Sequence, residues 1–229
     1  MVIRGIKQTL PGVYKITPDA GSAFFLRAEY LTRVKEERLV CVNGSLSEED
    51  SLFLPSENLL PGSAGVFDEG DTEDILHAAL VYACESAAMT YLARAEQSRA
   101  GLAQKLLKKG LDKNAVSIAL DFLEEAGYLS DERFAGAWLR SRSIDHAEGR
   151  RKLEAELSSR GIKKDSYEKA LNEFFEDKSE KALCERAYRK ITRSKKDIDE
   201  KKLYASLMRL GFPSKIIKSV LDENFDKSN

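Results

Sequence analysis

Two runs of the sequence concentrate basic side chains that could bind anions. Residues 140–164 contain 8 lysines and arginines against 4 acids, and residues 186–202 contain 8 against 3. Clustered cations attract DNA phosphates or an acidic protein surface, although a solvated charged surface would give the same pattern. The candidate partner-binding residues are Arg140, Arg142, Arg150, Arg151, Lys152, Arg189, Lys190, Arg193, Lys195 and Lys196.

The residue types that usually perform catalysis are scarce in this chain. His77 and His146 are its two histidines and lie in no metal-binding spacing, and neither GxSxG nor HExxH occurs. The segment GVFDEGD spaces two glycines like the ends of a phosphate-binding loop, but Asp71 stands where that loop requires a lysine. We therefore expect no catalytic, cofactor-binding or metal-binding residues, and a protein that is not an enzyme.

Charge is divided unevenly along the 229 residues, whose net charge is −1. Residues 1–75 hold 7 basic against 13 acidic side chains, a net charge of −6, while residues 76–229 carry a net charge of +5. This split predicts two parts with different roles. Three widely separated cysteines favour reduced thiols. No signal peptide or membrane-length apolar run is evident, so we expect a water-soluble, cytoplasmic protein without a membrane partner.

A pattern that occurs three times predicts most of the fold. Gly110, Gly161 and Gly211 are 51 and 50 residues apart, and leucine stands eight and four residues before each of them. Residues four apart share one face of a helix, and glycine readily adopts the left-handed conformation that ends a helix. We predict a helix before each glycine, a positive φ at the glycine and a second helix after it. Asp112 is the predicted N-cap of the first such second helix.

A further helical stretch precedes each of these helix pairs, and Ser130 is the predicted N-cap of the one that begins the second repeat. The sequence therefore predicts a mainly α protein with three tandem three-helix repeats that form an elongated curved array. The repeats are expected at residues 76–127, 129–177 and 178–229.

Residues 1–75 have a different character. GVYKITP, SAFFLRAEYL and ERLVCV are rich in β-branched and aromatic residues, and turn-forming residues separate them. SLSEED is predicted to open a short helix, with Ser45 and Glu48 as a capping box. We expect a small antiparallel β-rich segment followed by a linker, and we expect the helices to fold without it.

Two segments carry a resemblance to a known family. LARAEQSRAGLAQKLLKKG followed by ALDFLEEAGYLSDERFAGAWLRSR resembles the first repeat of the RecX family of bacterial regulators. GRRKLEAELSSRGI, residues 149–162, resembles the start of the second repeat of that family. The resemblance is strong over about residues 90–175, weaker over 178–226 and faint before 75.

The resemblance implies a non-enzymatic regulator that binds the RecA recombinase filament on single-stranded DNA. It implies restraint of ATP hydrolysis, strand exchange and coprotease activity, with weak binding to single- or double-stranded DNA and a monomeric chain. Two alternatives remain open. A direct DNA-binding module is one, although the stretch NAVSIALDFLEEAG is acidic at its end, which argues against insertion into a groove. The other is a scaffold for a different protein partner.

Overall fold

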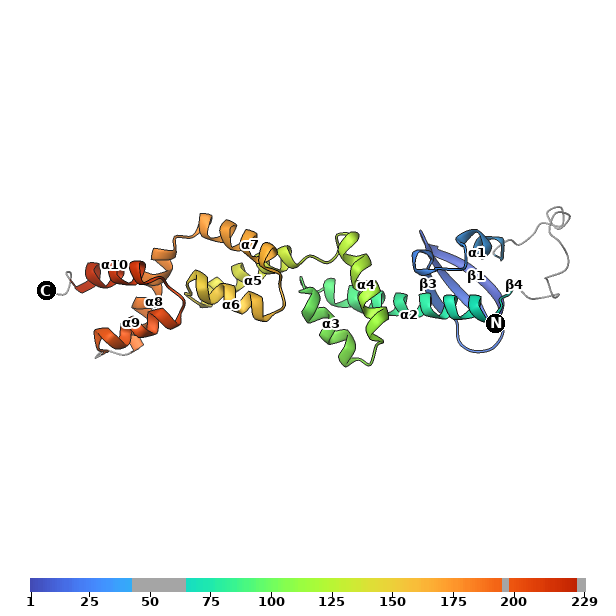
Figure 1. Ribbon diagram of the computed structural model, residues 1–229, viewed down its shortest axis with the longest axis horizontal. Helices are drawn as coiled ribbons and strands as arrows, with labels where there is room; N and C mark the ends of the chain where they lie inside the picture. Colours follow the sequence, from blue (N-terminus) through green and yellow to red (C-terminus); the bar gives the residue numbers. More distant parts are fainter. Residues whose placement is uncertain (43–64, 195–197, 226–229) are drawn as a thin grey trace. The chain divides into compact units, whose positions relative to one another are not determined.

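The chain folds into a small antiparallel sheet followed by helices, as the sequence predicts (Figure 1). The computed structural model describes residues 1–42, 65–194 and 198–225. These residues form two compact units, of which one comprises residues 1–90 and 105–125 and the other comprises residues 91–104 and 126–229. The mainly α fold class with a β-rich N-terminal segment is therefore confirmed.

The sheet has four strands in the order β3-β2-β1-β4, and its strand pairs are antiparallel. Their bounds are β1 Val2–Leu10, β2 Val13–Pro18, β3 Phe24–Arg27 and β4 Gly65–Val66. Pro11 and Gly12 connect β1 to β2, with Gly12 at a φ of 70° that favours glycine. Ile3, Ile16 and Leu26 are completely buried, so one face of the sheet belongs to a core.

The predicted strand in ERLVCV is wrong, because α1 spans Glu36–Val42 as a helix. The chain turns just before it, where the Asp74 carboxylate accepts hydrogen bonds from the N–H groups of Thr32, Arg33 and Val34. These donors are then unavailable to a neighbouring strand. The predicted short helix in SLSEED lies outside the described residues.

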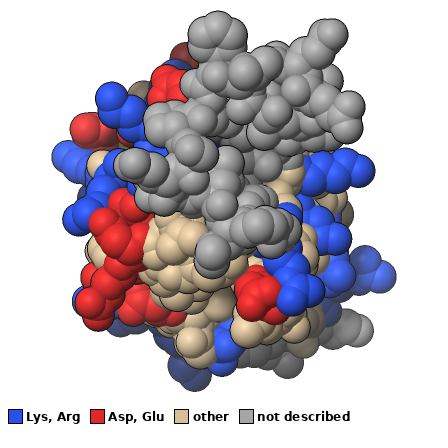
Figure 2. All heavy atoms as spheres, turned by 90° about the vertical axis from the view of Figure 1, so that its right-hand side faces the viewer, with Lys and Arg blue, Asp and Glu red and all other residues tan. Residues whose placement is uncertain are grey.

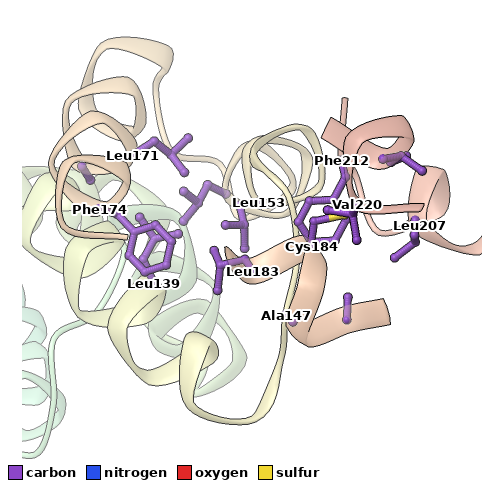
Figure 3. Close-up of a cluster of buried hydrophobic side chains, with 14 of the residues drawn as sticks. Leu139, Ala147, Leu153, Leu171, Phe174, Leu183, Cys184, Leu207, Phe212 and Val220 are labelled. Carbon is purple, nitrogen blue, oxygen red and sulfur yellow. The ribbon is translucent and has the colours of Figure 1, made fainter. Parts of the chain in front are cut away.

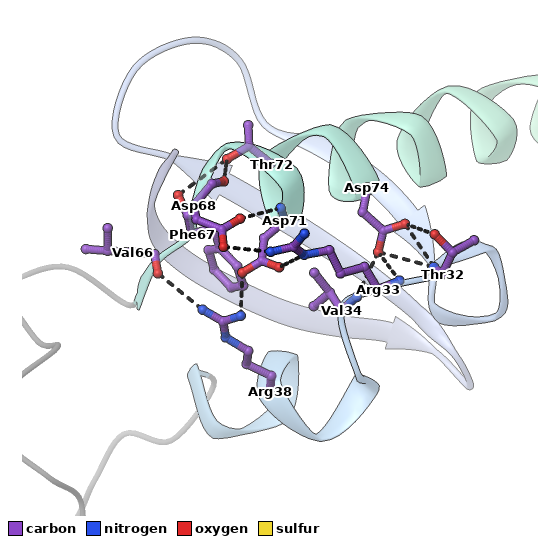
Figure 4. Close-up of polar contacts among 10 residues, drawn as sticks. All are labelled: Thr32, Arg33, Val34, Arg38, Val66, Phe67, Asp68, Asp71, Thr72 and Asp74. Carbon is purple, nitrogen blue, oxygen red and sulfur yellow. Dashed lines mark hydrogen bonds and ion pairs between the residues drawn. The ribbon is translucent and has the colours of Figure 1, made fainter.

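Helix α2 spans Glu69–Leu92 and runs beside the sheet (Figure 1). It is long and apolar enough to cross a membrane by length and composition. However, its Asp71 is buried and forms ion pairs with Arg33 at 2.9 Å and Arg38 at 2.5 Å (Figure 4). Buried carboxylates paired with arginines of the sheet segment are typical of a core helix in a water-soluble protein.

A second buried carboxylate joins the sheet to the helices. Glu85 of α2 accepts hydrogen bonds from Arg27 of β3 and, at 2.8 Å, from the Tyr30 hydroxyl. The Arg27 guanidinium also lies 4.5 Å from the ring centre of Phe122 and 5.9 Å from that of Tyr82. Since Phe122 belongs to α4 (Lys113–Glu125), the sheet packs against two helices of the first repeat. The expectation that the helices fold without the sheet stays a prediction, but it did not include these contacts.

The helices follow in three sets of three. Helices α2, α3 (Arg99–Lys108) and α4 (Lys113–Glu125) form the first set. The second set is α5 (Asp131–Asp145), α6 (Arg150–Ser159) and α7 (Lys164–Asp177), and the third is α8 (Glu180–Ser194), α9 (Glu200–Arg209) and α10 (Ser214–Phe225). Helix α2 begins before residue 76 because its first turns pack beside the sheet.

The three repeat glycines end their helices as predicted. Gly110, Gly161 and Gly211 have φ values of 80°, 76° and 87° and lie just beyond α3, α6 and α9. In each case the N–H after the glycine donates to the carbonyl five residues earlier, at 3.4 Å. This is the Schellman arrangement, which satisfies the last carbonyls of a helix. Asp112 and Ser130 accept N-cap hydrogen bonds, so both predicted caps are confirmed.

The repeated apolar positions form the core. The leucines eight and four residues before each glycine are all buried, from Leu102 and Leu106 to Leu203 and Leu207. Helices α5–α10 share one apolar cluster, which reaches from Leu139 to Phe212 (Figure 3). The second and third three-helix sets are consequently packed together rather than separated by solvent.

One contact recurs between consecutive sets. The Asp131 carboxylate at the start of α5 accepts a hydrogen bond from the Arg99 N–H at the start of α3, at 2.8 Å. The Glu180 carboxylate at the start of α8 accepts one from the Arg150 N–H at the start of α6, at 2.9 Å. Arg99 and Arg150 occupy equivalent repeat positions, so each acid caps the second helix of the preceding set.

Candidate functional site

The predicted basic residues fall into different environments. Arg142 on α5 and Lys152 on α6 both pair with Glu148, whose carboxylate is 3% exposed. Arg142 donates two hydrogen bonds to it, at 2.7 and 3.0 Å, and Lys152 lies 2.8 Å away. Burial alone would raise the pKa of Glu148, but these cations outweigh burial and lower the pKa to about 2. Arg142 and Lys152 therefore neutralise a buried charge between two helices.

Arg150 also has contacts within the chain. Its guanidinium donates to Glu154 at 3.0 Å and to the side chain of Asn172 at 2.5 Å. It also lies 5.8 Å from the ring centre of Phe175 on α7. These contacts hold α6 to α7 and offset the charge that Arg150 places at a helix N-terminus.

Arg151 differs from its neighbours on both sides. Its side chain is exposed, and among the described residues it has no hydrogen bond or ion pair. The same holds for Arg140 on α5 and Arg193 on α8. These three cations contribute little to packing and are open to a partner.

Helix α8 carries the remaining described candidates. Lys190 donates to the Asp145 carbonyl at 3.2 Å, and Arg186 donates to the Ser143 carbonyl at 2.6 Å. These contacts stabilise the C-terminal end of α5, where cations are favourable. Arg189 forms an ion pair with Glu185, one turn earlier, at 3.1 Å.

The basic side chains of α8 line an open hollow on the surface. Its lining residues are Arg189, Lys190, Arg193 and Ser194. The structure thus brings together three of the ten predicted candidates in one place. Lys195 and Lys196, which follow directly, lie outside the described residues.

Residues 1–75 were expected to be acidic, but the described residues of this segment, 1–42 and 65–75, expose less negative charge than the sequence suggests. Asp71 and Asp74 are buried and bound, and Arg4 pairs with Asp19 on the sheet. Among the described residues, the face shown in Figure 2 carries both acidic and basic side chains. The described candidate cations themselves lie on α5, α6 and α8.

Some residues that organise this surface were missed from the sequence. In the sequence, Glu148 is one of four acids within a basic run, and nothing distinguished it from the others. In the structure it forms ion pairs with two of the candidate cations, Arg142 and Lys152. Its spacing of four residues from Lys152 could have indicated the pair. Trp138 lies under two arginines, with the Arg160 guanidinium 4.7 Å and the Arg142 guanidinium 5.4 Å from its ring. The Arg142 contact spans four residues within α5 and could have been read from the spacing. No spacing signals the Arg160 contact, because Arg160 follows a different helix, α6.

Metal binding and thiol reactivity find no support in the described part of the chain. In that part of the chain, no group of three or more histidine, cysteine, aspartate or glutamate side chains could hold a metal ion. Cys84 and Cys184 are buried free thiols. Burial raises the pKa of Cys184 to about 11, which keeps that thiol protonated and unreactive.

Comparison with protein families and solved structures identifies the relatives of this chain. Residues 84–123 match the family model described as RecX, first three-helix domain, and residues 130–171 match RecX, second three-helix domain. A crystal structure of regulatory protein RecX superimposes with a TM-score of 0.68 at 20% identity, over 97% of this chain and all of the other. The crystal structure of RecX from Lactobacillus salivarius gives a TM-score of 0.55 at 22% identity, over 63% and 96% of the two chains. These likenesses show the same fold.

Sequence relatives give the family. Regulatory protein RecX of Treponema pallidum (strain Nichols) is 38% identical over 112 residues, which cover 49% of this chain and 68% of the relative. Regulatory protein RecX of Prosthecochloris aestuarii is 33% identical over 138 residues, which cover 59% of this chain and 89% of the relative. Regulatory protein RecX of Clostridium botulinum (strain Eklund 17B / Type B) is 26% identical over 195 residues, which cover 81% of this chain and 91% of the relative. On this combined similarity of sequence and fold, the chain belongs to the RecX family of regulatory proteins.

Proposed function

We propose that this chain binds the filament that the RecA recombinase forms on single-stranded DNA and restrains its activity. The restrained activities would be ATP hydrolysis, strand exchange and the coprotease function. Membership of a family of regulatory proteins supports a regulatory role. In this proposal the chain acts by occupying a surface, without chemistry of its own, as a cytoplasmic monomer.

The observation that carries the proposal is the hollow lined by Arg189, Lys190 and Arg193. A nucleoprotein filament presents DNA phosphates and acidic side chains together, and both attract a cluster of cations. Within the described residues, Arg193 has no ion pair, and Arg189 has only an exposed pair one turn away. Exposed pairs of this kind contribute at most about 1 kcal/mol, so they exchange readily for contacts with a partner.

The proposed contact residues are the exposed members of the predicted set. Arg140, Arg151, Arg189 and Arg193 are exposed, whereas Arg142, Arg150 and Lys152 are held by acids of the chain. Because α5–α10 share one core, these cations sit on a fixed scaffold and lose little freedom on binding. A fixed surface of this kind could block addition of RecA protomers or promote their release.

The test is the single-stranded-DNA-dependent ATPase activity of the cognate RecA, with and without this protein. We expect the ATPase rate to fall as the protein is added. An Arg189→Glu, Arg193→Glu double variant should require at least about tenfold more protein for half-maximal inhibition, equivalent to about 1.4 kcal/mol. Lys201→Glu with Lys202→Glu, which changes the same charge elsewhere, is the matched control. An unchanged ATPase rate at saturating protein would contradict the proposal.

Direct DNA binding is a second candidate, favoured by the same basic hollow. It predicts that the isolated protein binds DNA tightly and that its affinity falls steeply with salt. Inhibition of RecA would then disappear when excess single-stranded DNA is supplied. A protein that binds the filament much more tightly than free DNA supports the RecA proposal instead. A scaffold for another protein partner would bind neither the RecA filament nor free DNA.

A further inference from the structure

An exposed apolar side chain lies close to the proposed contact surface, since the carbonyl of the next residue, Asp145, accepts a hydrogen bond from Lys190. Ile144, in the last turn of α5, is 75% exposed, more than any other large apolar side chain among the described residues. Burying such a side chain against a partner would contribute to affinity, because apolar area would leave water. Single exposed apolar residues are common, so the surroundings of Ile144 decide whether it has a role.

The backbone around Ile144 is held by the next three-helix set. The carbonyl groups of Ser143 and His146 accept hydrogen bonds from Arg186, and that of Asp145 accepts one from Lys190. Three of the carbonyls flanking Ile144 on both sides are thus fixed by α8. The isoleucine is consequently presented from an ordered helix end, which lowers the entropy lost on binding.

Cations lie near this isoleucine on α5 and on α8. Arg140 lies one turn earlier on the same face of α5, and Lys190 joins the Asp145 carbonyl to the hollow that Arg189 and Arg193 also line. Two acids, Asp145 and Glu185, belong to the same area, so the surroundings stay net positive. An apolar centre with a charged rim is the usual composition of a protein-binding hot spot.

We propose that Ile144 is the apolar anchor of a protein-docking surface whose rim is formed by Arg140, Arg189, Lys190 and Arg193. The matching partner surface is an apolar pocket bordered by carboxylates. Phosphates would satisfy the cations but would leave the isoleucine in water, which favours a protein as the partner. The inference rests on the proposed function, and it assigns this contact to a RecA protomer of the filament rather than to the DNA.

The test compares filament binding by the full chain and by Ile144→Ala, at low and at high salt. Ile144→Ala should bind the RecA filament at least about fivefold more weakly, because less apolar area leaves water on binding. The loss should persist at high salt, since salt screens charges and not apolar burial. Arg193→Gln should weaken binding at low salt only. Leu107→Ala removes another exposed apolar side chain, on α3, and should bind like the unchanged protein.

Measurements on free DNA and on folding complete the design. Affinity for single-stranded DNA alone should be the same for Ile144→Ala and the unchanged chain. Equal losses on DNA and on the filament would overturn the inference in favour of a side chain that inserts between bases. Full filament binding by Ile144→Ala, with an unchanged melting temperature, would overturn the docking surface while leaving the proposed function intact. Failure of the unchanged chain to bind the filament would overturn both.

Discussion

Gly149, which precedes α6, lies against the backbone of Gly211, which follows α9. A β-carbon placed on Gly149 would lie 2.5 Å from the carbonyl carbon of Gly211, and the Gly149 N–H donates to the Leu210 carbonyl at 2.8 Å. The two glycines thus join the second and third three-helix sets through their main chains. The first junction is similar, since a β-carbon on Gly161 would lie 2.6 Å from that of Ala100.

Replacing Gly211 should therefore cost more than its helix-ending conformation alone explains. Gly211 has a φ of 87°, a left-handed backbone conformation that is unfavourable for alanine. In Gly211→Ala, the alanine β-carbon would also lie 2.7 Å from the β-carbon of Lys152. We expect a loss of about 3 kcal/mol or more in the free energy of unfolding, typical of overpacked buried sites. Urea denaturation followed by circular dichroism would measure it.

Gly110→Ala is the matched control. Gly110 has a φ of 80°, but a β-carbon there would have no other atom within 4 Å. Its substitution should cost only the left-handed penalty of about 1–2 kcal/mol. Equal losses for both variants would show that the contact between the two sets contributes nothing.

Charge reversal at the start of α6 should have opposite effects at two adjacent positions. In Arg151→Glu, an exposed side chain without an ion pair in the described structure becomes an acid at a helix N-terminus. Stability should hold or rise, by at most about 1 kcal/mol. Thermal melting with added salt would measure both this effect and its screening.

Arg150→Glu should lower stability instead. It would place a third carboxylate beside Glu154 and Glu180, which now bind the side chain and the N–H of Arg150. We expect a loss of about 1–3 kcal/mol, the range for a broken charged hydrogen bond. A melting temperature for Arg150→Glu at or above that of Arg151→Glu would show instead that the favourable position of an acid at a helix N-terminus outweighs these lost contacts.

The buried Glu148 makes stability depend on pH in the acid range. Its folded-state pKa of about 2 lies below its ordinary value of 4.5, so its contribution is complete above pH 4.5 and is lost as pH falls towards 2. Glu148→Gln leaves Arg142 and Lys152 without their acid and should cost about 3 kcal/mol at neutral pH. Unfolding of both proteins between pH 7 and pH 2.5 should show this difference shrinking below about pH 4.5. A constant difference across that range would mean that Glu148 is not bound as an anion.

Removal of residues 1–71 should damage the first three-helix set. The deletion cuts α2 within its first turn and removes Arg27 and Tyr30, which contact Glu85 of α2 and Phe122 of α4. Losing these hydrogen bonds to a charged group should by itself cost about 1.5–3 kcal/mol. The truncated chain should therefore lose the cooperative melting of its N-terminal helices. Hydrogen exchange at α4 that matches the full-length protein would instead show that the helices fold without the sheet.

The three-helix repeats could be predicted from the sequence because their determinants are local. Contacts within one short segment set the end of the second helix of each repeat. The segment contains two leucines four residues apart, the glycine and the apolar residue that follows it. Gly110, Gly161 and Gly211 accordingly adopt the predicted conformation. ERLVCV, expected as part of the β-rich segment, is helical instead, and the backbone just before it is held by Asp74, far along the chain.

The basic runs could likewise be identified from the sequence. The accessibility of each cation could not be predicted from it. Arg150, Arg151 and Lys152 are adjacent and chemically similar, yet only Arg151 lacks an acid partner in the described structure. Electrostatic attraction depends on distance in space and on burial, and both are set by how α5, α6, α7 and α8 pack. The sequence by itself therefore determined which residues are charged and where the helices end. Only the tertiary structure decided that Glu148 holds two cations internally and that Ile144 stands exposed among others, because these relations join residues on different helices.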